Sequence, residues 1–218
     1  MDSASNELKG NLWLARALFD LGGVQFGSFT LGRSTVNSPV YINPRVLVSQ
    51  PRYLKAVAEL IRQETSFGQA RRRPRIAPFD LVAGVPFGGL HLATAFSLLT
   101  ETPMIYVRPG GEEDRRIEGR YEEGQTVLII DDLITTGGSI LETAGILEAH
   151  GLKVRDVIVL VDREQGATER LRRRGYNLVP ILRLTVMLNY YYNTGLIDEF
   201  WYRRSLEYLR ANQASPEE

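Results

Sequence analysis

The strongest constraint on the fold is an alternation of short apolar runs with segments of helical spacing from residue 79 onward. Apolar runs with the length of buried strands lie at 81–84, 104–107, 126–130 and 157–161. Segments with helical spacing lie between or after them, at 90–99, 139–150 and 167–174. Such alternation is typical of parallel strands joined by right-handed helical crossovers. The sequence therefore predicts an α/β fold built on a twisted parallel sheet flanked by helices.

The two ends of the chain follow a different pattern. The spacing predicts a helix at 7–18, short strands at 26–31 and 40–43, and a helix from Pro51 to about residue 62, followed by a surface connection. The last forty residues predict a strand or turn around 188–195 and a closing helix at 198–209. No repeat or linker divides the chain, and 218 residues suit one domain over 1–218.

Composition excludes several classes of function. Lys plus Arg equals Asp plus Glu, at 26 each, so we expect no general attraction for nucleic acid or an anionic membrane. The absence of cysteine excludes disulfides, thiolate metal sites and cysteine nucleophiles. No apolar run reaches the roughly 20 residues of a membrane helix, and the acidic N-terminal segment does not resemble a secretory signal. We expect a cytoplasmic protein.

The stretch VLIIDDLITTGGSI, residues 127–140, combines a strand, two carboxylates and a loop of hydroxyls and glycines. In open parallel sheets ligands bind at the carboxyl ends of strands, which is where Asp131 and Asp132 are expected. The following helix is expected to begin near Ser139, with Ser139 and Glu142 forming a capping box. Backbone N–H groups, the helix dipole and nearby hydroxyls then make an anion site of Thr135, Thr136, Gly137, Gly138 and Ser139.

The carboxylate pair narrows the choice of ligand. The loop lacks the lysine of a nucleoside triphosphate site and the glycine pattern of a dinucleotide site. Asp131 and Asp132 repel phosphate, but they suit hydroxyl groups or a divalent cation that bridges them to the ligand. Phosphate in the loop and sugar hydroxyls over the carboxylates describe a ribose 5-phosphate. The alternative is structural, with the aspartates only ending a strand and Ser139 only capping a helix.

Several segments together resemble a known family. IIDDLITTGGSI resembles the phosphoribosyl-pyrophosphate (PRPP) signature of type I phosphoribosyltransferases. FGSFTL, SPVYIN, GVPFGGLHLAT, RIEG and VLVDREQGATERL resemble successive segments of orotate phosphoribosyltransferases, in order over about residues 10–210. The resemblance implies the type I phosphoribosyltransferase fold, with a small hood contributed mainly by about residues 1–50. It also implies Mg²⁺ as cofactor and a homodimer.

The resemblance implies a reaction and a role for each matching residue. Orotate would take the phosphoribosyl group of PRPP, giving orotidine 5'-monophosphate and pyrophosphate in pyrimidine synthesis. Asp131 and Asp132 would hold the ribose hydroxyls, and Mg²⁺ through ligand or water, and would act in catalysis with Arg108. The remaining assignments are residues 135–139 for the 5-phosphate, Phe87 and Gly88 in the 84–89 loop for pyrophosphate, and Arg163 and Tyr41 for orotate.

The sequence departs from the family at its catalytic loop. The family's loop carries an arginine, two lysines and a histidine or tyrosine, whereas this chain reads RPGGEED from Arg108. The lysine expected after FTL is also absent, and Arg33, Arg115 or Arg116 are candidates to replace the lost charges. Two alternatives therefore stay open. One is a phosphoribosyltransferase for another base, and the other is a non-catalytic protein that senses PRPP or a nucleotide.

Overall fold

A six-stranded sheet forms the centre of the computed structural model, which describes residues 11–31, 35–110 and 116–212. The strand order is β5-β4-β3-β6-β7-β8, and all neighbours are parallel except β4 and β5. The strands are β3 (Leu81–Gly84), β4 (Met104–Val107), β5 (Ile117–Glu118), β6 (Thr126–Ile134), β7 (Lys153–Asp162) and β8 (Asn177–Arg183). The predicted α/β fold with a mostly parallel sheet is confirmed.

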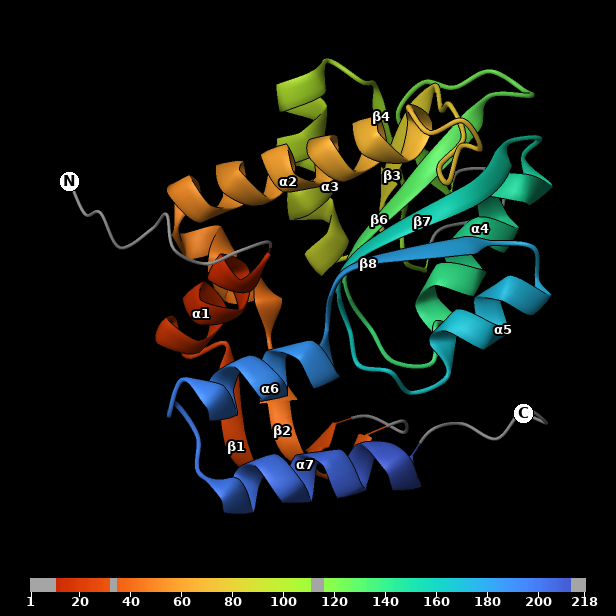
Figure 1. The fold of residues 1–218 in the computed structure, drawn as a ribbon. Helices are drawn as coiled ribbons and strands as arrows, with labels where there is room; N and C mark the ends of the chain where they lie inside the picture. Colours follow the sequence, from red (N-terminus) through yellow and green to blue (C-terminus); the bar gives the residue numbers. More distant parts are fainter. Residues whose placement is uncertain (1–10, 32–34, 111–115, 213–218) are drawn as a thin grey trace.

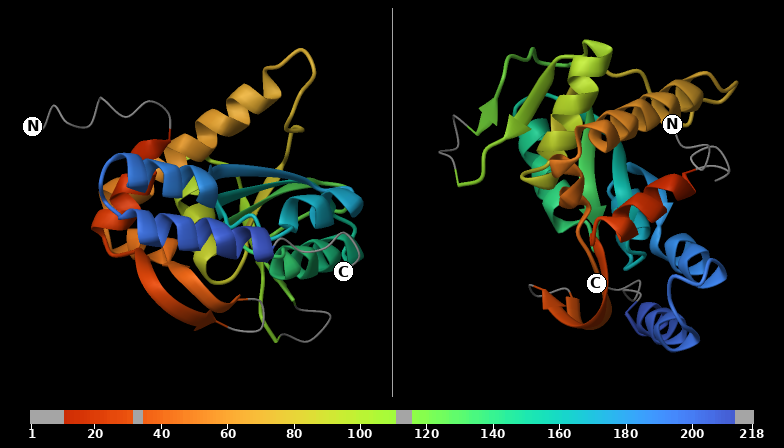
Figure 2. Two further views of the ribbon diagram at one scale, coloured as in Figure 1. Left: turned by 60° about the horizontal axis from the view of Figure 1, so that its bottom comes forward. Right: turned by 90° about the vertical axis from the view of Figure 1, so that its left-hand side faces the viewer.

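Helices cover both faces of this sheet, as Figures 1 and 2 show. One face carries α2 (Pro51–Gln69) and α3 (Gly88–Thr100), and the other carries α4 (Gly138–Ala149) and α5 (Ala167–Arg173). Side chains alternate along a strand. In β6, Leu128 and Ile130 therefore join the core under α2 and α3, while Val127 and Ile129 join the core under α4 and α5. Because both faces are buried, the strands read as continuous apolar runs.

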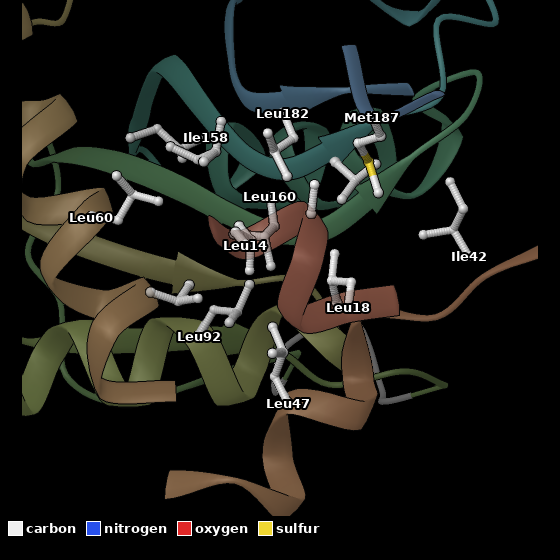
Figure 3. Packing of buried hydrophobic residues seen from close by; sticks show 14 of the residues in the cluster. Leu14, Leu18, Ile42, Leu47, Leu60, Leu92, Ile158, Leu160, Leu182 and Met187 are labelled. Atoms are coloured by element: carbon white, nitrogen blue, oxygen red, sulfur yellow. The ribbon is translucent and has the colours of Figure 1, made fainter. Parts of the chain in front are cut away.

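The larger core also includes α1 (Leu12–Asp20), which packs against the end of the sheet (Figure 3). Leu14 and Leu18 of α1 are fully buried among side chains that include Leu160 and Met187. Burying one such side chain stabilises a fold by about 1.5–3 kcal/mol. The core therefore fastens the N-terminal helix to the central sheet.

A second, smaller sheet pairs β1 (Val24–Leu31) with β2 (Thr35–Ile42) in antiparallel register. The C-terminal helices α6 (Leu184–Asn193) and α7 (Glu199–Ala211) pack beside it, α6 against α1 and α7 against β2 (Figure 1). The buried Tyr191 hydroxyl donates to the carbonyl of Ala15 at 2.8 Å. The first and last segments of the chain therefore form one unit at the end of the large sheet.

The C-terminal region differs from the sequence analysis in two places. Residues 177–183 form strand β8, which the sequence analysis missed, and its Pro180 lies opposite Val159 of β7. Proline is tolerated there because β8 is an edge strand of the sheet. The LNYYYN segment lies in helix α6, where Tyr190 and Tyr191 are buried at helical spacing, rather than in a strand or turn.

Helix α2 is longer than predicted and continues to Gln69. Its last turn packs through Gly68, where an added Cβ would lie 2.8 Å from Ile76. The polar residues of this turn suggested a surface connection, but the glycine allows the chain to return closely along the helix. Within the described residues, no helix combines the length and apolar character needed to cross a bilayer.

Candidate active site

The acidic pair lies where β3 ends and β6 continues. β3 stops at Gly84, opposite Ile130, whereas β7 still pairs with β6 as far as Ile134. Asp131 and Asp132 therefore remain inside β6 but extend beyond its neighbour β3. The predicted strand end at residue 130 was too early. The expected position of the pair, at the carboxyl edge of the sheet, is observed.

The VPFGG loop after β3 closes directly onto this pair. A Cβ placed on Gly88 would lie 2.2 Å from Cγ of Asp132, and one on Gly89 would lie 2.4 Å from the carbonyl oxygen of Ile130. Separations below about 3 Å are not available to a side chain, so only glycine allows this approach. Phe87, in the same loop, is 68% exposed. The loop and the acidic pair therefore form a single continuous surface.

Burial controls the electrostatics of the two carboxyl groups. Asp131 is 6% exposed, and its Oδ1 accepts the N–H of Asp132 at 2.8 Å. Burial, reinforced by the neighbouring charge of Asp132, raises the pKa of Asp131 well above its usual range. Burial also raises the pKa of Asp132, and the cation of Arg45 opposes this shift. The site therefore holds two carboxyl groups that are costly to ionise side by side.

This cost predicts that Asp131→Asn stabilises the protein near neutral pH. Because the folded-state pKa of Asp131 is raised, the folded protein releases this proton at higher pH than the unfolded chain does. Between the two pKa values the folded state binds more protons, so stability falls as the pH rises. Asparagine does not titrate, and its Oδ1 can still accept the Asp132 N–H. The gain should be small below about pH 4 and should grow as the pH rises.

The measurement is urea unfolding of both proteins across this pH range, in EDTA and without ligand. A matched control is Asp20→Asn, since Asp20 is half exposed and paired with Arg16 at 2.8 Å. We expect no stability gain with rising pH for that variant. Equal stability of wild type and Asp131→Asn at every pH would show that the buried carboxyl group carries no such penalty.

The predicted anion loop forms a small cradle at the start of α4. A cavity of about 50 Å³ lies among Asp131, Leu133, Ile134, Thr135, Gly137, Gly138, Ser139 and Ile140. Gly137 has φ 84°, and a Cβ there would lie 2.5 Å from Leu171. The helix begins at Gly138, and no described side chain caps it. Its first-turn N–H groups are therefore directed toward the cradle.

The predicted capping box was wrong. Ser139 lies inside the first turn of α4 instead of preceding it, because the left-handed Gly137 starts the helix one residue earlier. Glu142 instead accepts from Arg116 at 3.4 Å. The Ser139 hydroxyl is therefore not used to cap the helix.

A second cavity, of about 280 Å³, adjoins the cradle and shares Ser139 with it. Its lining also includes Pro86, Phe87, Pro109, Arg116 and Glu142. The Nε of Arg116 is buried and has no hydrogen-bond partner within the described structure. Arg108 lies at the base of the same loop, where its N–H donates to the Arg116 carbonyl at 2.7 Å and its side chain pairs with Glu118 at 3.5 Å. Arg33 and Arg115 lie outside the described residues.

Arg163 follows β7 and reaches across to the small sheet. It is 1% exposed, and its Nη2 donates to Ser38 Oγ at 2.9 Å and to the Val40 carbonyl at 3.3 Å. Burial lowers the pKa of its guanidinium. Within the described chain its Nε has no partner, and no carboxylate forms an ion pair with it. Arg163 is therefore a buried cation whose Nε donor has no partner within the described residues.

The carboxylates next to Arg163 in sequence do not pair with it. Asp162 accepts the N–H of Glu164 at 2.7 Å, and Glu164 accepts the N–H of Thr185 at 2.7 Å and also its hydroxyl. Arg163 therefore forms no ion pair with Asp162 or Glu164 among the described contacts. Tyr41, on β2, is partly buried, and its ring packs against Phe29 at 5.5 Å between centroids.

Sequence reasoning missed two residues of this region, Arg45 and Ser38. Arg45 lies in the short helix η2 (Pro44–Ser49), with its Nε 3.7 Å from Oδ2 of Asp132. Ser38 is fully buried and accepts from Arg163, which is 125 residues away in the chain. Ser38 begins the SPVYIN segment, but nothing in that segment signals a contact with Arg163, and Arg45 belongs to no motif of the sequence analysis. Their position next to the motif residues depends on the tertiary fold.

Comparison with known proteins gives consistent matches. A family model described as the phosphoribosyl transferase domain matches residues 47–173. An orotate phosphoribosyltransferase of Pyrococcus abyssi is 36% identical over 172 residues, covering 78% of this chain and 90% of that protein. A uridine 5'-monophosphate synthase of Bos taurus is 39% identical over 189 residues. This match covers 85% of the chain but only 37% of the bovine protein.

The fold comparison agrees with the sequence comparison. The crystal structure of an orotate phosphoribosyltransferase from Aeropyrum pernix superposes with a TM-score of 0.67 at 33% identity. The match covers 81% of this chain and 98% of that one. The similarity therefore extends over nearly the whole length of the archaeal proteins.

Proposed function

The chain belongs to the orotate phosphoribosyltransferase family, and on that premise we propose that it transfers the 5-phosphoribosyl group of PRPP to orotate. The ring nitrogen N1 of orotate forms a bond to the anomeric carbon and loses its proton. The bond from that carbon to pyrophosphate breaks, and pyrophosphate leaves with the electron pair. The products are orotidine 5'-monophosphate and pyrophosphate.

One observation carries this proposal: the acidic pair joins the VPFGG loop to the cradle, because Asp132 lies against Gly88 of the loop and Asp131 lines the cradle cavity. The spacing suits a ligand with phosphate at one end, a sugar diol in the middle and pyrophosphate at the other end. The 5-phosphate takes the N–H groups and hydroxyls of residues 135–139. The diol faces Asp131 and Asp132, and pyrophosphate faces the backbone of Phe87 and Gly88. Positive charge that develops on the ribose is stabilised by the carboxylates.

Mg²⁺ fits this arrangement. Among the described residues, no group of three or more histidine, aspartate or glutamate side chains could hold a metal alone. Mg²⁺ commonly binds through one or two carboxylates together with phosphates and water. Asp131 and Asp132 would hold it through the ligand or water, and it would neutralise charge on the pyrophosphate.

Arg163 supplies the recognition of the base. A guanidinium binds a carboxylate through its N–H donors, and the Nε of Arg163 has no partner in the described structure. The orotate carboxylate is the group that this cation would take. Tyr41 lies on β2, the strand to which Arg163 is bonded, and would pack against the base. Arg116 lines the cavity beside Phe87 and would meet the pyrophosphate there, and Arg108, now paired with Glu118, would join it.

The experiment that tests the proposal is a screen of bases with PRPP and Mg²⁺, following loss of orotate by absorbance. Turnover of orotate and of no other base in the screen supports the proposal. Turnover of a different base supports the first alternative. Tight PRPP binding without turnover of any base supports a sensing protein, whose catalytic loop has lost its lysines. We further propose a cytoplasmic location and a homodimer, the latter measurable by sedimentation.

Gly88→Ala is expected to lower kcat/KM on the order of 10²-fold. The new methyl group would overlap the Asp132 carboxylate, so the carboxylate or the loop must move. Displacing a positioned group by about 1 Å can cost this much. The measurement is steady-state turnover of orotate, with thermal unfolding to confirm the fold.

Gly145→Ala is the matched control for this variant. Gly145 is exposed on α4, and no described atom lies within 4 Å of its added Cβ. Alanine there should raise stability by about 0.5–1 kcal/mol and leave turnover unchanged. Wild-type activity in Gly88→Ala would mean that contact between the loop and Asp132 is not needed for catalysis.

A further inference from the structure

Arg45 is the cation that the fold brings to the acidic pair. Its Nε lies 3.7 Å from Asp132 Oδ2 and 3.3 Å from the Asn43 side-chain oxygen, to which it donates. The Arg45 side chain is 56% exposed, so its guanidinium is only partly committed. Within the described residues, no other cation forms an ion pair with Asp131 or Asp132. Arg45 therefore lies beside Asp132, and its partly exposed guanidinium can still donate hydrogen bonds to a ligand.

The surroundings of Arg45 place it at the pyrophosphate end of the proposed ligand. The helix η2 contacts both β6 and α3. Helix α3 begins at Gly88, which touches the same Asp132 carboxylate on which Arg45 rests. Arg45, Asp132 and Gly88 thus lie side by side. A group bound on the backbone of Gly88 is within the neighbourhood of the Arg45 guanidinium.

The chemistry of this end requires positive charge. Departing pyrophosphate gains negative charge as its bond to the ribose breaks. The chain has three lysines, and the two described ones lie elsewhere. Lys55 is exposed on α2, and Lys153 is exposed at the start of β7, at the opposite end of that strand from Asp162. Among the described residues, an arginine is therefore the side chain that can add positive charge to that of Mg²⁺ at this end.

We propose that Arg45 is a further catalytic residue, which binds the pyrophosphate of PRPP and stabilises it as it leaves. The inference rests on the proposed function, since it names a contact with the same substrate. In the ligand-free site the guanidinium lies against Asp132. When the sugar diol occupies the carboxylates, the guanidinium turns to the pyrophosphate oxygens. An arginine from the segment after β2 thereby supplies charge that the catalytic loop lacks.

The test compares two ligands that differ only in pyrophosphate. PRPP and ribose 5-phosphate are titrated by calorimetry into wild type, Arg45→Ala and Arg45→Lys. We expect Arg45→Ala to bind PRPP about 10- to 100-fold more weakly and ribose 5-phosphate as wild type does, because one charged contact is lost. Turnover of Arg45→Ala should fall on the order of 10²-fold. Arg45→Lys should recover part of the PRPP affinity and part of the turnover.

Arg52→Ala is the matched control. Arg52 is exposed near the start of α2, lies over the ring of Tyr53 at 4.7 Å, and forms no ion pair with the acidic pair among the described residues. Unchanged PRPP affinity in Arg45→Ala, or equal weakening of both ligands, would overturn the inference. If wild type binds PRPP without turnover, the proposed reaction fails while the binding comparison still decides the role of Arg45. If wild type does not bind PRPP, both proposals fall.

Discussion

Replacing Asp132 with asparagine is expected to lower kcat/KM for orotate on the order of 10²–10³ without lowering stability. Asparagine keeps the shape that fits against Gly88 but removes the charge that faces the ribose. Burial raises the pKa of Asp132, so the ionised carboxylate costs stability and its loss should not destabilise the fold. Steady-state kinetics and urea unfolding measure the two effects separately.

Asp80→Asn is the matched control for Asp132→Asn. Asp80 lies at the opposite end of β6, where its carboxylate accepts the N–H of Thr126 at 2.8 Å. Asparagine can accept the same bond, so turnover should remain at the wild-type level. If Asp132→Asn kept full activity, the carboxylate would have no part in stabilising the ribose, and the proposed mechanism would be wrong.

Arg163→Ala is expected to lower kcat/KM for orotate, mainly through KM for the base, by a factor that corresponds to about 2–5 kcal/mol of lost transition-state stabilisation. The variant loses the cation that would bind the orotate carboxylate. Because PRPP occupies the other end of the site, its affinity should change only slightly. Arg163→Lys keeps the charge but loses the paired donors, so it should be intermediate.

Uracil, which lacks the carboxylate, makes the Arg163 experiment specific. Wild type should prefer orotate to uracil, and Arg163→Ala should lose most of that preference. Arg155→Ala serves as control, since Arg155 is exposed near the start of the same strand, β7. If Arg163→Ala slowed both bases equally, Arg163 would have a structural role only, and recognition of the base would have to lie elsewhere.

The sequence predicted the parts of the site that depend on strand order. The loops that follow parallel strands lie at one edge of the sheet, so the motifs after β3, β6 and β7 were expected to lie together there. The hydroxyls and glycines before the predicted helix then indicated an anion site, and the structure has a small cavity there, lined by Thr135 and Ser139. These features follow from local pattern and from the geometry of a parallel sheet.

Contacts between distant segments could not be predicted in this way. Arg45 reaches Asp132 because η2 packs on β6 and α3, and no local pattern in NPRVLVS signals that position. The Arg163–Ser38 bond joins the large sheet to the small one. Helix α6 was missed because three consecutive tyrosines favour a strand by propensity, whereas burial of Tyr191 against α1 selects the helix.

The bonds from Arg163 to β2 constrain how this protein can acquire a new specificity. The Arg163 side chain, which is proposed to bind the base, also joins β2 of the small sheet to the end of β7 through its hydrogen bonds to Ser38 and Val40. A substitution at Arg163 that admits a different base therefore removes an anchor at the same time. We expect laboratory evolution toward neutral bases to require compensating changes on β2, with position 38 among the first to respond.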